Sequence, residues 1–250
     1  MSLYLPRHFE QQDPQALQAL MHDHPLATWV CVVEGEPVIN HLPLHLDPTR
    51  GKHGTLIGHV ARANPVWQLR PTSSVVIFHG PQAYVTPSWY PTKQASGKVV
   101  PTWNYAVVHA HGLPRFIEDR DELHALVSRL TDRHEAGRAH PWSVNDAPPD
   151  YTQTMLGAIV GLEIEITNIQ GKFKLSQNRL PVDQRGVLEG AAQGADDQVG
   201  GEDGAIEIGR IDGGVSHDPE CRPPRPMASA SVSDRPNRSH RASARAGHGT

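Results

Sequence analysis

An aromatic segment between positions 84 and 105 is the part of the sequence best suited to hold a ligand. It contains half of the chain's ten Trp and Tyr residues, in YVTPSWYPTK and, after a Gly/Ser spacer, in PTWNY. Prolines at positions 81, 87, 91 and 101 prevent a continuous helix. Flat apolar faces beside hydroxyl, amide and ammonium donors suit a planar, charged ligand. The alternative is a pair of ordinary strands whose aromatic side chains fill the core.

The segment 171–179, GKFKLSQNR, is the second place where polar side chains gather. It carries three cations, a hydroxyl and two amides. A core excludes such groups unless they are paired, whereas phosphate oxygens are bound by them. We interpret the segment as a contact for a phosphate or for a ligand held by another subunit. A solvated strand end is the alternative.

The sixteen histidines do not form a recognisable metal site. His41 and His45 would share one face of a strand, but four residues at about 3.3 Å each put them roughly 13 Å apart. His109 and His111 are close enough for co-ligation, yet neither a carboxylate nor a third histidine stands at metal-site spacing beside them. The GxSxG, GxxxxGK and GxGxxG motifs are also missing, which argues against hydrolase, P-loop and Rossmann classes. We predict no metal, and the catalytic residues stay unknown.

Composition indicates a cytoplasmic protein. The chain has 250 residues, of which 38% are hydrophobic, and no apolar run approaches the roughly 20 residues that span a bilayer. The first eight residues lack the features of a signal peptide. Cys31 lies in an apolar run and Cys221 in a polar one, which excludes a disulfide framework. The net charge of −4 gives no electrostatic footprint for nucleic acid or for an acidic membrane.

The composition changes near residue 190, and we predict a folded domain at residues 1–189 with a disordered tail at residues 190–250. Beyond Leu188 the chain has no Leu, Phe, Trp, Tyr or Lys. Such a segment cannot bury enough apolar surface to offset the entropy of ordering. Acids dominate residues 196–220 and arginines dominate residues 222–245. A solvated tail, a basic end that touches nucleic acid and an out-of-frame product of a GC-rich gene are the alternatives.

Two longer helices are predicted within residues 1–189. Asp13-Pro14 supplies a cap and a first helical position, and His24-Pro25 ends that helix. Asp119, with an acid three residues on, opens the other helix. Each helix buries one apolar stripe, formed by Leu17, Leu20 and Met21 in the first and by Leu123, Leu126, Val127 and Leu130 in the second.

Strands account for most of the remaining domain. Runs at residues 26–34 and 37–46 are joined at Gly35-Glu36, which is typical of a tight hairpin. Further strands are predicted at residues 55–60 and 74–80, with a short helix from Asn64-Pro65 between them. Residues 162–167 alternate apolar with polar side chains, Glu163 among them, which predicts a strand with one buried face. Residues 103–109 place Trp103, Tyr105, Val107 and His109 on one face and Asn104, Ala106 and Val108 on the other, as in a strand that lines a pocket.

Four motifs together resemble one family. They are GHVARANPVW at 58–67, FHGPQAYVTPSWY at 78–90, VPTWNY at 100–105 and KLSQNR at 174–179. The chain resembles the PaiB-type FMN-binding proteins, named as negative transcriptional regulators of sporulation and protease genes, over about residues 1–189. The resemblance implies a mainly β (α+β) split β-barrel, related to pyridoxamine-phosphate-oxidase and flavin-reductase folds, that works as a homodimer with FMN at the subunit interface. Family members continue after KLSQNR into a short helical end, from which this sequence departs.

The resemblance and the side-chain chemistry select the same residues for FMN. The phosphate needs cations, and the isoalloxazine needs aromatic faces and amides. Simpler roles are that Arg62 caps a neighbouring helix and that Trp103 belongs to the core. The candidates are Arg62, Asn64 and Lys93 with His59 at the phosphate, Trp103, Asn104 and Tyr105 at the ring, and Lys174, Gln177 and Arg179 from the partner subunit.

Two functional classes follow from the resemblance. In the first, the protein is a flavin-binding regulator or repressor in which FMN is a structural element or redox sensor. In the second, it is a flavin-dependent oxidoreductase or oxidase, with haem degradation as a more distant variant, and His109 or Tyr105 is its acid or base. Residues 1–189 hold no helix-turn-helix signal and slightly more acids than bases, so direct DNA binding is not supported. We favour the regulator and leave catalysis open.

Overall fold

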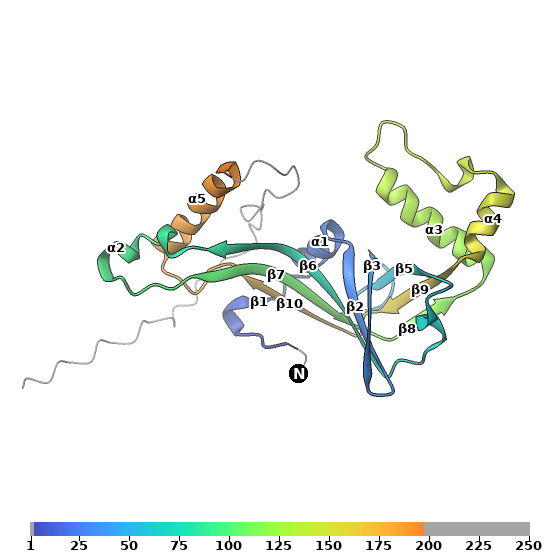
Figure 1. Ribbon diagram of the computed structural model, residues 1–250, viewed down its shortest axis with the longest axis horizontal. Helices are drawn as coiled ribbons and strands as arrows, with labels where there is room; N and C mark the ends of the chain where they lie inside the picture. Colours follow the sequence, from blue (N-terminus) through green and yellow to red (C-terminus); the bar gives the residue numbers. More distant parts are fainter. Residues whose placement is uncertain (1–2, 198–250) are drawn as a thin grey trace, which may run out of the picture. The chain divides into compact units, whose positions relative to one another are not determined.

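Two antiparallel sheets carry the fold (Figure 1). The computed structural model describes residues 3–197, so residues 198–250, most of the predicted tail, lie outside the described residues. The larger sheet has the strand order β1 (Glu10–Gln11), β10 (Asn168–Lys174), β7 (Thr102–His111), β6 (Ser73–Val85), β2 (Leu26–Val33), β3 (Glu36–Pro43). The smaller sheet has the order β4 (His45–Asp47), β5 (Thr55–Ala61), β9 (Ile159–Glu165), β8 (Pro114–Ile117). The mainly β prediction is confirmed.

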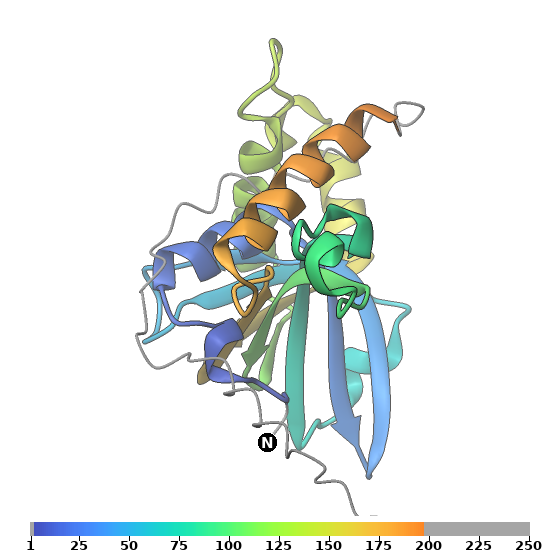
Figure 2. The ribbon, with the colours of Figure 1, turned by 90° about the vertical axis from the view of Figure 1, so that its left-hand side faces the viewer.

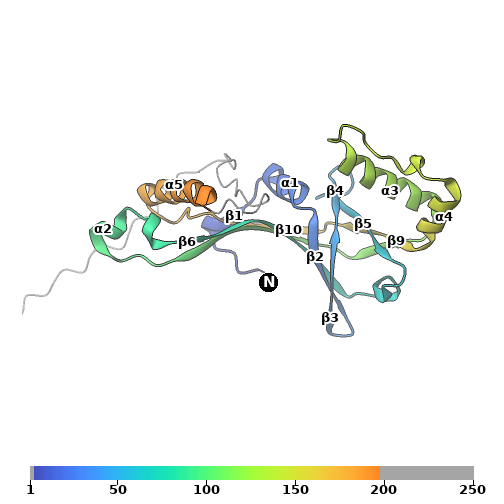
Figure 3. The same cartoon turned by 45° about the horizontal axis from the view of Figure 1, so that its top comes forward.

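Helices cover the sheets at two separate places. In Figure 3, α3 and α4 lie over β5 and β9 of the smaller sheet. The helices α2 and α5 lie away from them, at the C-terminal end of β6. Within residues 3–197, no helix is long and apolar enough to cross a membrane. The helices are α1 (Pro14–Asp23), α2 (Thr92–Ser96), α3 (Arg120–Glu135), α4 (Pro149–Gly157) and α5 (Pro181–Asp197), with short 3₁₀ turns η1 (Arg7–Phe9), η2 (Pro65–Gln68), η3 (Pro87–Trp89) and η4 (Val144–Asp146).

Local sequence signals explain where these elements begin and turn. The Asp13 side chain accepts the Gln15 N–H at the start of α1, and the Asp119 side chain caps α3. Both predicted helices are therefore confirmed. The β2–β3 hairpin is also confirmed, but its turn is Glu34–Gly35, one residue earlier than predicted, with φ of 52° and 90°. Two consecutive positive φ values belong to the tight turn whose twist matches that of paired strands.

The main core lies between the sheets and α1, and it is built from alternate residues of the strands. Its fully buried side chains include Trp29, Phe78, Leu44, Leu56 and Leu162. The Trp29 indole N–H donates to Ser74 Oγ at 2.6 Å, which satisfies the buried polar group of the largest of these side chains.

Removing the acceptor of this bond is expected to destabilise the fold. Ser74→Ala should lower the free energy of unfolding by about 1–3 kcal/mol, because the buried Trp29 N–H loses its partner. Urea denaturation measures the change. Ser73→Ala, at the exposed neighbouring position, should change stability by less than about 0.5 kcal/mol. Equal effects of the two substitutions would contradict this role of the bond.

The strand β6 continues past Pro81 because its register to β7 shifts between His79 and Gln82. A proline has no N–H for the ladder and is tolerated in a sheet at such an irregularity. The strand predicted at residues 74–80 is consequently longer, and it extends to Val85. Past the shift, Tyr84 is opposite Trp103, so the aromatic segment of β6 joins that of β7.

The C-terminal helix α5 is fixed to this end of the sheet (Figure 2). Its Asp183 carboxylate accepts hydrogen bonds from the Thr92 N–H and hydroxyl. Val187 is buried with Val85 and Tyr90 in a small separate cluster. A helical end therefore follows KLSQNR, contrary to the departure inferred from the sequence. The helix also crosses the domain boundary placed at residue 189, which stays a prediction.

Candidate functional site

The aromatic and cationic segments meet at one end of the larger sheet. We call this region the arm: residues 82–105, from the end of β6 to the start of β7, and residues 172–190, from the end of β10 into α5. Trp103 and Tyr84 are 52% and 50% exposed, and their rings meet edge to face with centroids 6.2 Å apart. Large aromatic side chains left half in solvent are available to a ligand or to another subunit.

Two lysines of β10 flank Tyr105 on the arm. Lys172 Nζ lies 5.5 Å and Lys174 Nζ 5.9 Å from the Tyr105 ring centroid. Lys172 is buried and donates to the Tyr4 carbonyl, whereas Lys174 donates to Thr102 Oγ1 and to the Trp103 carbonyl. Burial lowers the pKa of Lys174. The two ammonium groups make this part of the arm electropositive.

Two further cations lie near the tip of the arm. The exposed Lys93 donates to Ser88 Oγ at 3.3 Å, and the Arg179 guanidinium lies 4.8 Å from the Tyr90 ring centroid. Among the described residues, neither side chain forms an ion pair with a carboxylate, and neither does Lys174. Cations without carboxylate partners are suited to an external anion such as a phosphate.

Two predicted amides of the arm bond to the protein itself. Asn104 is buried and exchanges hydrogen bonds with Ser176 Oγ at 3.0 and 3.1 Å. Gln177 accepts the Leu175 N–H at 2.7 Å and donates to the Phe173 carbonyl. Both amides thus hold the turn between β10 and α5, and their contact with FMN stays a prediction.

The other three predicted residues lie away from the arm, on β5 and next to η2. Arg62 donates to the Gly157 and Ile159 carbonyls at the end of α4 and pairs with Glu118 at 2.8 Å. This is the helix-capping role named as the alternative for Arg62. Asn64 caps η2 through the Val66 N–H and donates to Asn40.

His59 faces a cavity under α3. Its Nδ1 is buried without a hydrogen-bond partner among the described residues, and burial lowers its pKa. One chain therefore brings seven of the ten candidates together on the arm and leaves His59, Arg62 and Asn64 at the other sheet.

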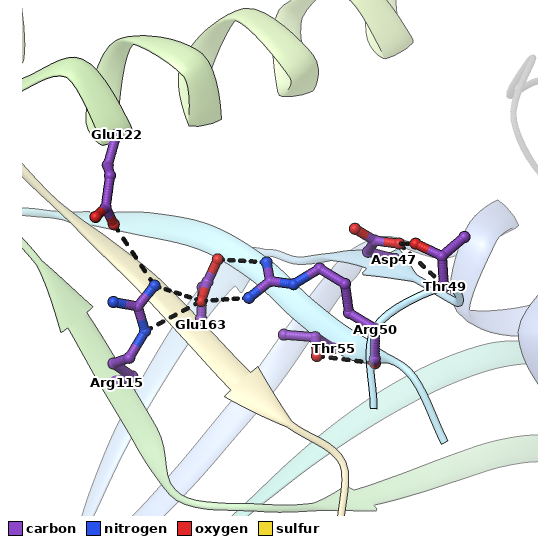
Figure 4. A network of polar contacts seen from close by, with 7 residues as sticks. All are labelled: Asp47, Thr49, Arg50, Thr55, Arg115, Glu122 and Glu163. Carbon is purple, nitrogen blue, oxygen red and sulfur yellow. Dashed lines mark hydrogen bonds and ion pairs between the residues drawn. The ribbon is translucent and has the colours of Figure 1, made fainter. Parts of the chain in front are cut away.

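A buried carboxylate on β9 was not foreseen from the sequence. Glu163 alternates with apolar residues and was expected opposite the buried face, but it is buried. Its carboxylate accepts from Arg50 at 2.6 and 2.9 Å and from Arg115 at 2.8 and 3.2 Å (Figure 4). The paired guanidiniums lower the pKa of Glu163 to about 2, against the effect of burial. The strand β9 is buried on both of its faces, which explains the error.

His109 and Tyr105 were the sequence candidates for an acid or base. His109 lies on β7, and burial, with His111, His79 and Lys172 nearby, lowers its pKa. Its Nδ1 has no hydrogen-bond partner among the described residues. A neutral imidazole at pH 7 is able to accept a proton.

Within residues 3–197, no three His, Cys, Asp or Glu side chains are grouped as a metal site requires.

Comparison with known proteins decides the family. The family described as "Putative FMN-binding domain" matches residues 3–168. The chain belongs to this FMN-binding family. It is 32% identical over 189 residues to "Protease synthase and sporulation protein PAI 2" of Bacillus subtilis, with 75% of this chain and 88% of that protein covered. It is 33% identical to "Uncharacterized protein AN0679" of Emericella nidulans, with 75% and 90% covered.

A solved structure supports the fold. The FAD and heme binding protein from Mycobacterium smegmatis superposes with a TM-score of 0.50 at 18% identity, over 66% of this chain and 73% of that chain. The fold is a flavin-binding split β-barrel, as the resemblance implied. FMN is the cofactor of this family, and the arm fits it. Its exposed rings suit the isoalloxazine, and its cations, which have no carboxylate partners within residues 3–197, suit the phosphate.

Proposed function

We propose that the protein is an FMN-binding regulator that works as a homodimer. Each FMN is held between the arm of one protomer and residues 62–64 of the other, which connect β5 to η2. The observation that carries this proposal is that three cations of the arm, Lys93, Lys174 and Arg179, form no ion pair with a carboxylate within residues 3–197, while the rings of Trp103 and Tyr84 on the same arm are half exposed.

The candidate FMN-binding residues fall into two groups that lie far apart in one chain, and this supports a dimer. Arg62 and Asn64 lie at the end of β5 and in the turn that follows, and the arm is at the opposite end of the described fold (Figure 1). A second copy brings the two segments together without any change within either chain. FMN then links two protomers, so its binding changes the interface between them. This link is the regulatory step of the proposal.

The Bacillus subtilis relative is named for protease synthesis and sporulation, and the resemblance to PaiB-type proteins implies a regulator of such genes. When bound, FMN supplies a ring that accepts and returns electrons. Around it, Lys93 and Arg179 bind the phosphate charge, Trp103 and Tyr84 stack on the ring, and Lys174 holds the start of β7 in place through its two hydrogen bonds. A flavin-dependent oxidoreductase is the second candidate, and His109, whose Nδ1 is buried without a hydrogen-bond partner among the described residues, is its candidate proton acceptor.

Loss of a phosphate contact is expected to lower the affinity for FMN much more than the affinity for riboflavin. Lys93→Ala should weaken FMN about tenfold or more and riboflavin less than about twofold, because only FMN carries the phosphate that a charge-assisted hydrogen bond would meet. Lys52→Ala, which removes an exposed cation outside the arm, between β4 and β5, should change neither affinity. Flavin fluorescence titration measures all four values. Equal losses for the two flavins would remove Lys93 from the phosphate site.

The stacking role predicts a different pattern. Trp103→Ala should weaken both flavins by similar factors of about 5 to 100, because a stacked ring contributes on the order of 1–3 kcal/mol. The apo-protein should keep most of its stability, because this side chain is half exposed.

Sedimentation with and without FMN tests the dimer. A monomer that binds one FMN would contradict the shared site.

A further inference from the structure

Two adjoining cavities lie between α3 and the smaller sheet, away from the arm. The larger, about 350 Å³, is lined mainly by apolar side chains of the β3–β4 junction and α3, with His45, His59 and Trp142 at its walls. The smaller, about 160 Å³, is lined by Arg129 and Arg133 among others. His45 and Leu130 line both, so the two cavities meet there. The larger cavity is within the range of small-molecule sites, about 300–1,000 Å³.

Two arginines, Arg129 and Arg133, line the smaller cavity together with Asp47. Arg129 and Arg133 form no ion pair within residues 3–197. Arg133 Nη1 lies 3.1 Å from His45 Nε2. Burial and the Arg133 charge lower the pKa of His45 to about 4, so the imidazole is neutral and accepts this hydrogen bond. Because Arg133 has no other hydrogen-bonding partner within residues 3–197, it retains donors for an anion.

Two acids line these cavities, Asp47 the smaller and Glu135 the larger, and both already have other partners, as does the nearby Asp23. Asp47 accepts from the Thr49 N–H and hydroxyl, and Asp23 lies 2.7 Å from His22. Glu135 pairs with Arg138 at 2.9 Å and accepts the Trp142 N–H. The two guanidiniums are therefore the groups still available for a strong ionic contact. The apolar cavity beside them fits the uncharged body of the same ligand.

We propose that these cavities form a binding site, distinct from the FMN site, for a small apolar carboxylate. Its hydrocarbon or aromatic body fills the larger cavity between Leu44, Val127 and Leu130. Its carboxylate lies at the junction, where Arg133 donates to it and Arg129 adds a second positive charge. His59, whose Nδ1 is buried without a partner, lines the apolar part of the site.

The test uses the full chain with 2-naphthoate, and 2-naphthamide as the uncharged match. Fluorescence titration should give saturable binding of one naphthoate per chain. Arg133→Gln should weaken naphthoate about tenfold and naphthamide less than about twofold. Arg70→Gln, at an exposed position on another loop, should leave both unchanged. Equal losses for the two probes with Arg133→Gln, or no saturable binding, would overturn the proposal.

Filling the cavity supplies an independent check. Thr131→Trp adds a large side chain at the wall of the larger cavity and should abolish binding of both probes. Ala125→Trp adds the same side chain at an exposed position of α3 and should abolish neither. Excess FMN should not displace naphthoate. Displacement would show that the cavities belong to the flavin site and would refute a separate one, whereas a failure of FMN to bind at all would leave the naphthoate result unaffected.

Discussion

Glu163→Gln is expected to lower the free energy of unfolding at pH 7 by about 3 kcal/mol. The carboxylate is buried and its pKa falls from 4.5 to about 2 in the folded protein. Each pKa unit corresponds to about 1.4 kcal/mol of preference for the ionised form in the folded state. The side chains of Arg50 and Arg115 are 40% and 59% exposed, so water can solvate them when the carboxylate is lost. Most of the lost stability therefore belongs to the buried carboxylate. Urea denaturation measures the change.

The same substitution should alter the pH dependence of stability. A depressed folded pKa contributes stability that is complete above the unfolded pKa, near 4.5, and is lost as the pH falls towards 2. The wild-type protein should therefore lose about 3 kcal/mol more than the Glu163→Gln variant across this window. Glu165→Gln, at an exposed position on the same strand, serves as the control. Identical pH profiles for wild type and Glu163→Gln would show that the network does not stabilise the fold.

Gly186→Ala is expected to displace α5 from η3, at a cost of about 3 kcal/mol. A Cβ at this position would lie 2.1 Å from the Trp89 carbonyl oxygen and 2.9 Å from Pro91 Cδ. A backbone oxygen cannot rotate away, so the helix must move. The expected loss of stability is therefore at the upper end of the range for overpacked substitutions, about 1–3 kcal/mol. The helical preference for alanine over glycine, about 1 kcal/mol, opposes the loss without cancelling it.

Displacement of α5 has local consequences that can be measured. Trypsin should cleave after Arg185 faster in the variant, because this exposed residue is protected by the docked helix. Flavin affinity should fall as well, because Arg179 leads into the same helix. Gly137→Ala, where a Cβ meets nothing within 4 Å, is the matched control and should not destabilise. A variant with unchanged stability and cleavage would refute close packing at Gly186.

The sequence predicted the elements that depend on local signals. Asp13 and Asp119 cap their helices because the donors they satisfy lie two or three residues away. Glu163 was misjudged because its partners are distant: Arg50 lies 113 positions and Arg115 48 positions away. Alternation shows which residues share a face, but not whether helices cover the opposite face. That information arises only when α3 and α4 pack on the smaller sheet.

The candidate site shows the same limit. Aromatic and cationic side chains of the arm could be selected by chemical type, and the structure brings Trp103, Lys174 and Arg179 into one region. Chemical type does not reveal an internal partner, however. Asn104 meets Ser176 from 72 positions away, and Arg62 meets carbonyls at the end of α4. Those bonds depend on the tertiary fold, so the sequence could not show them, and the contact of these side chains with FMN stays a prediction.

The first strand, β1, pairs with β10, which is made much later in synthesis. This separation along the chain affects folding. Glu10 pairs with Lys172, and Leu17 packs so closely on Gly171 that a Cβ there would lie 2.2 Å from its side chain. At about 5–20 residues per second, a ribosome releases β1 and α1 many seconds before β10. Until β10 emerges, β7 has an open edge, which invites pairing with other chains. Fragments that stop before Asn168 are therefore expected to aggregate instead of folding, however many of the earlier elements they contain.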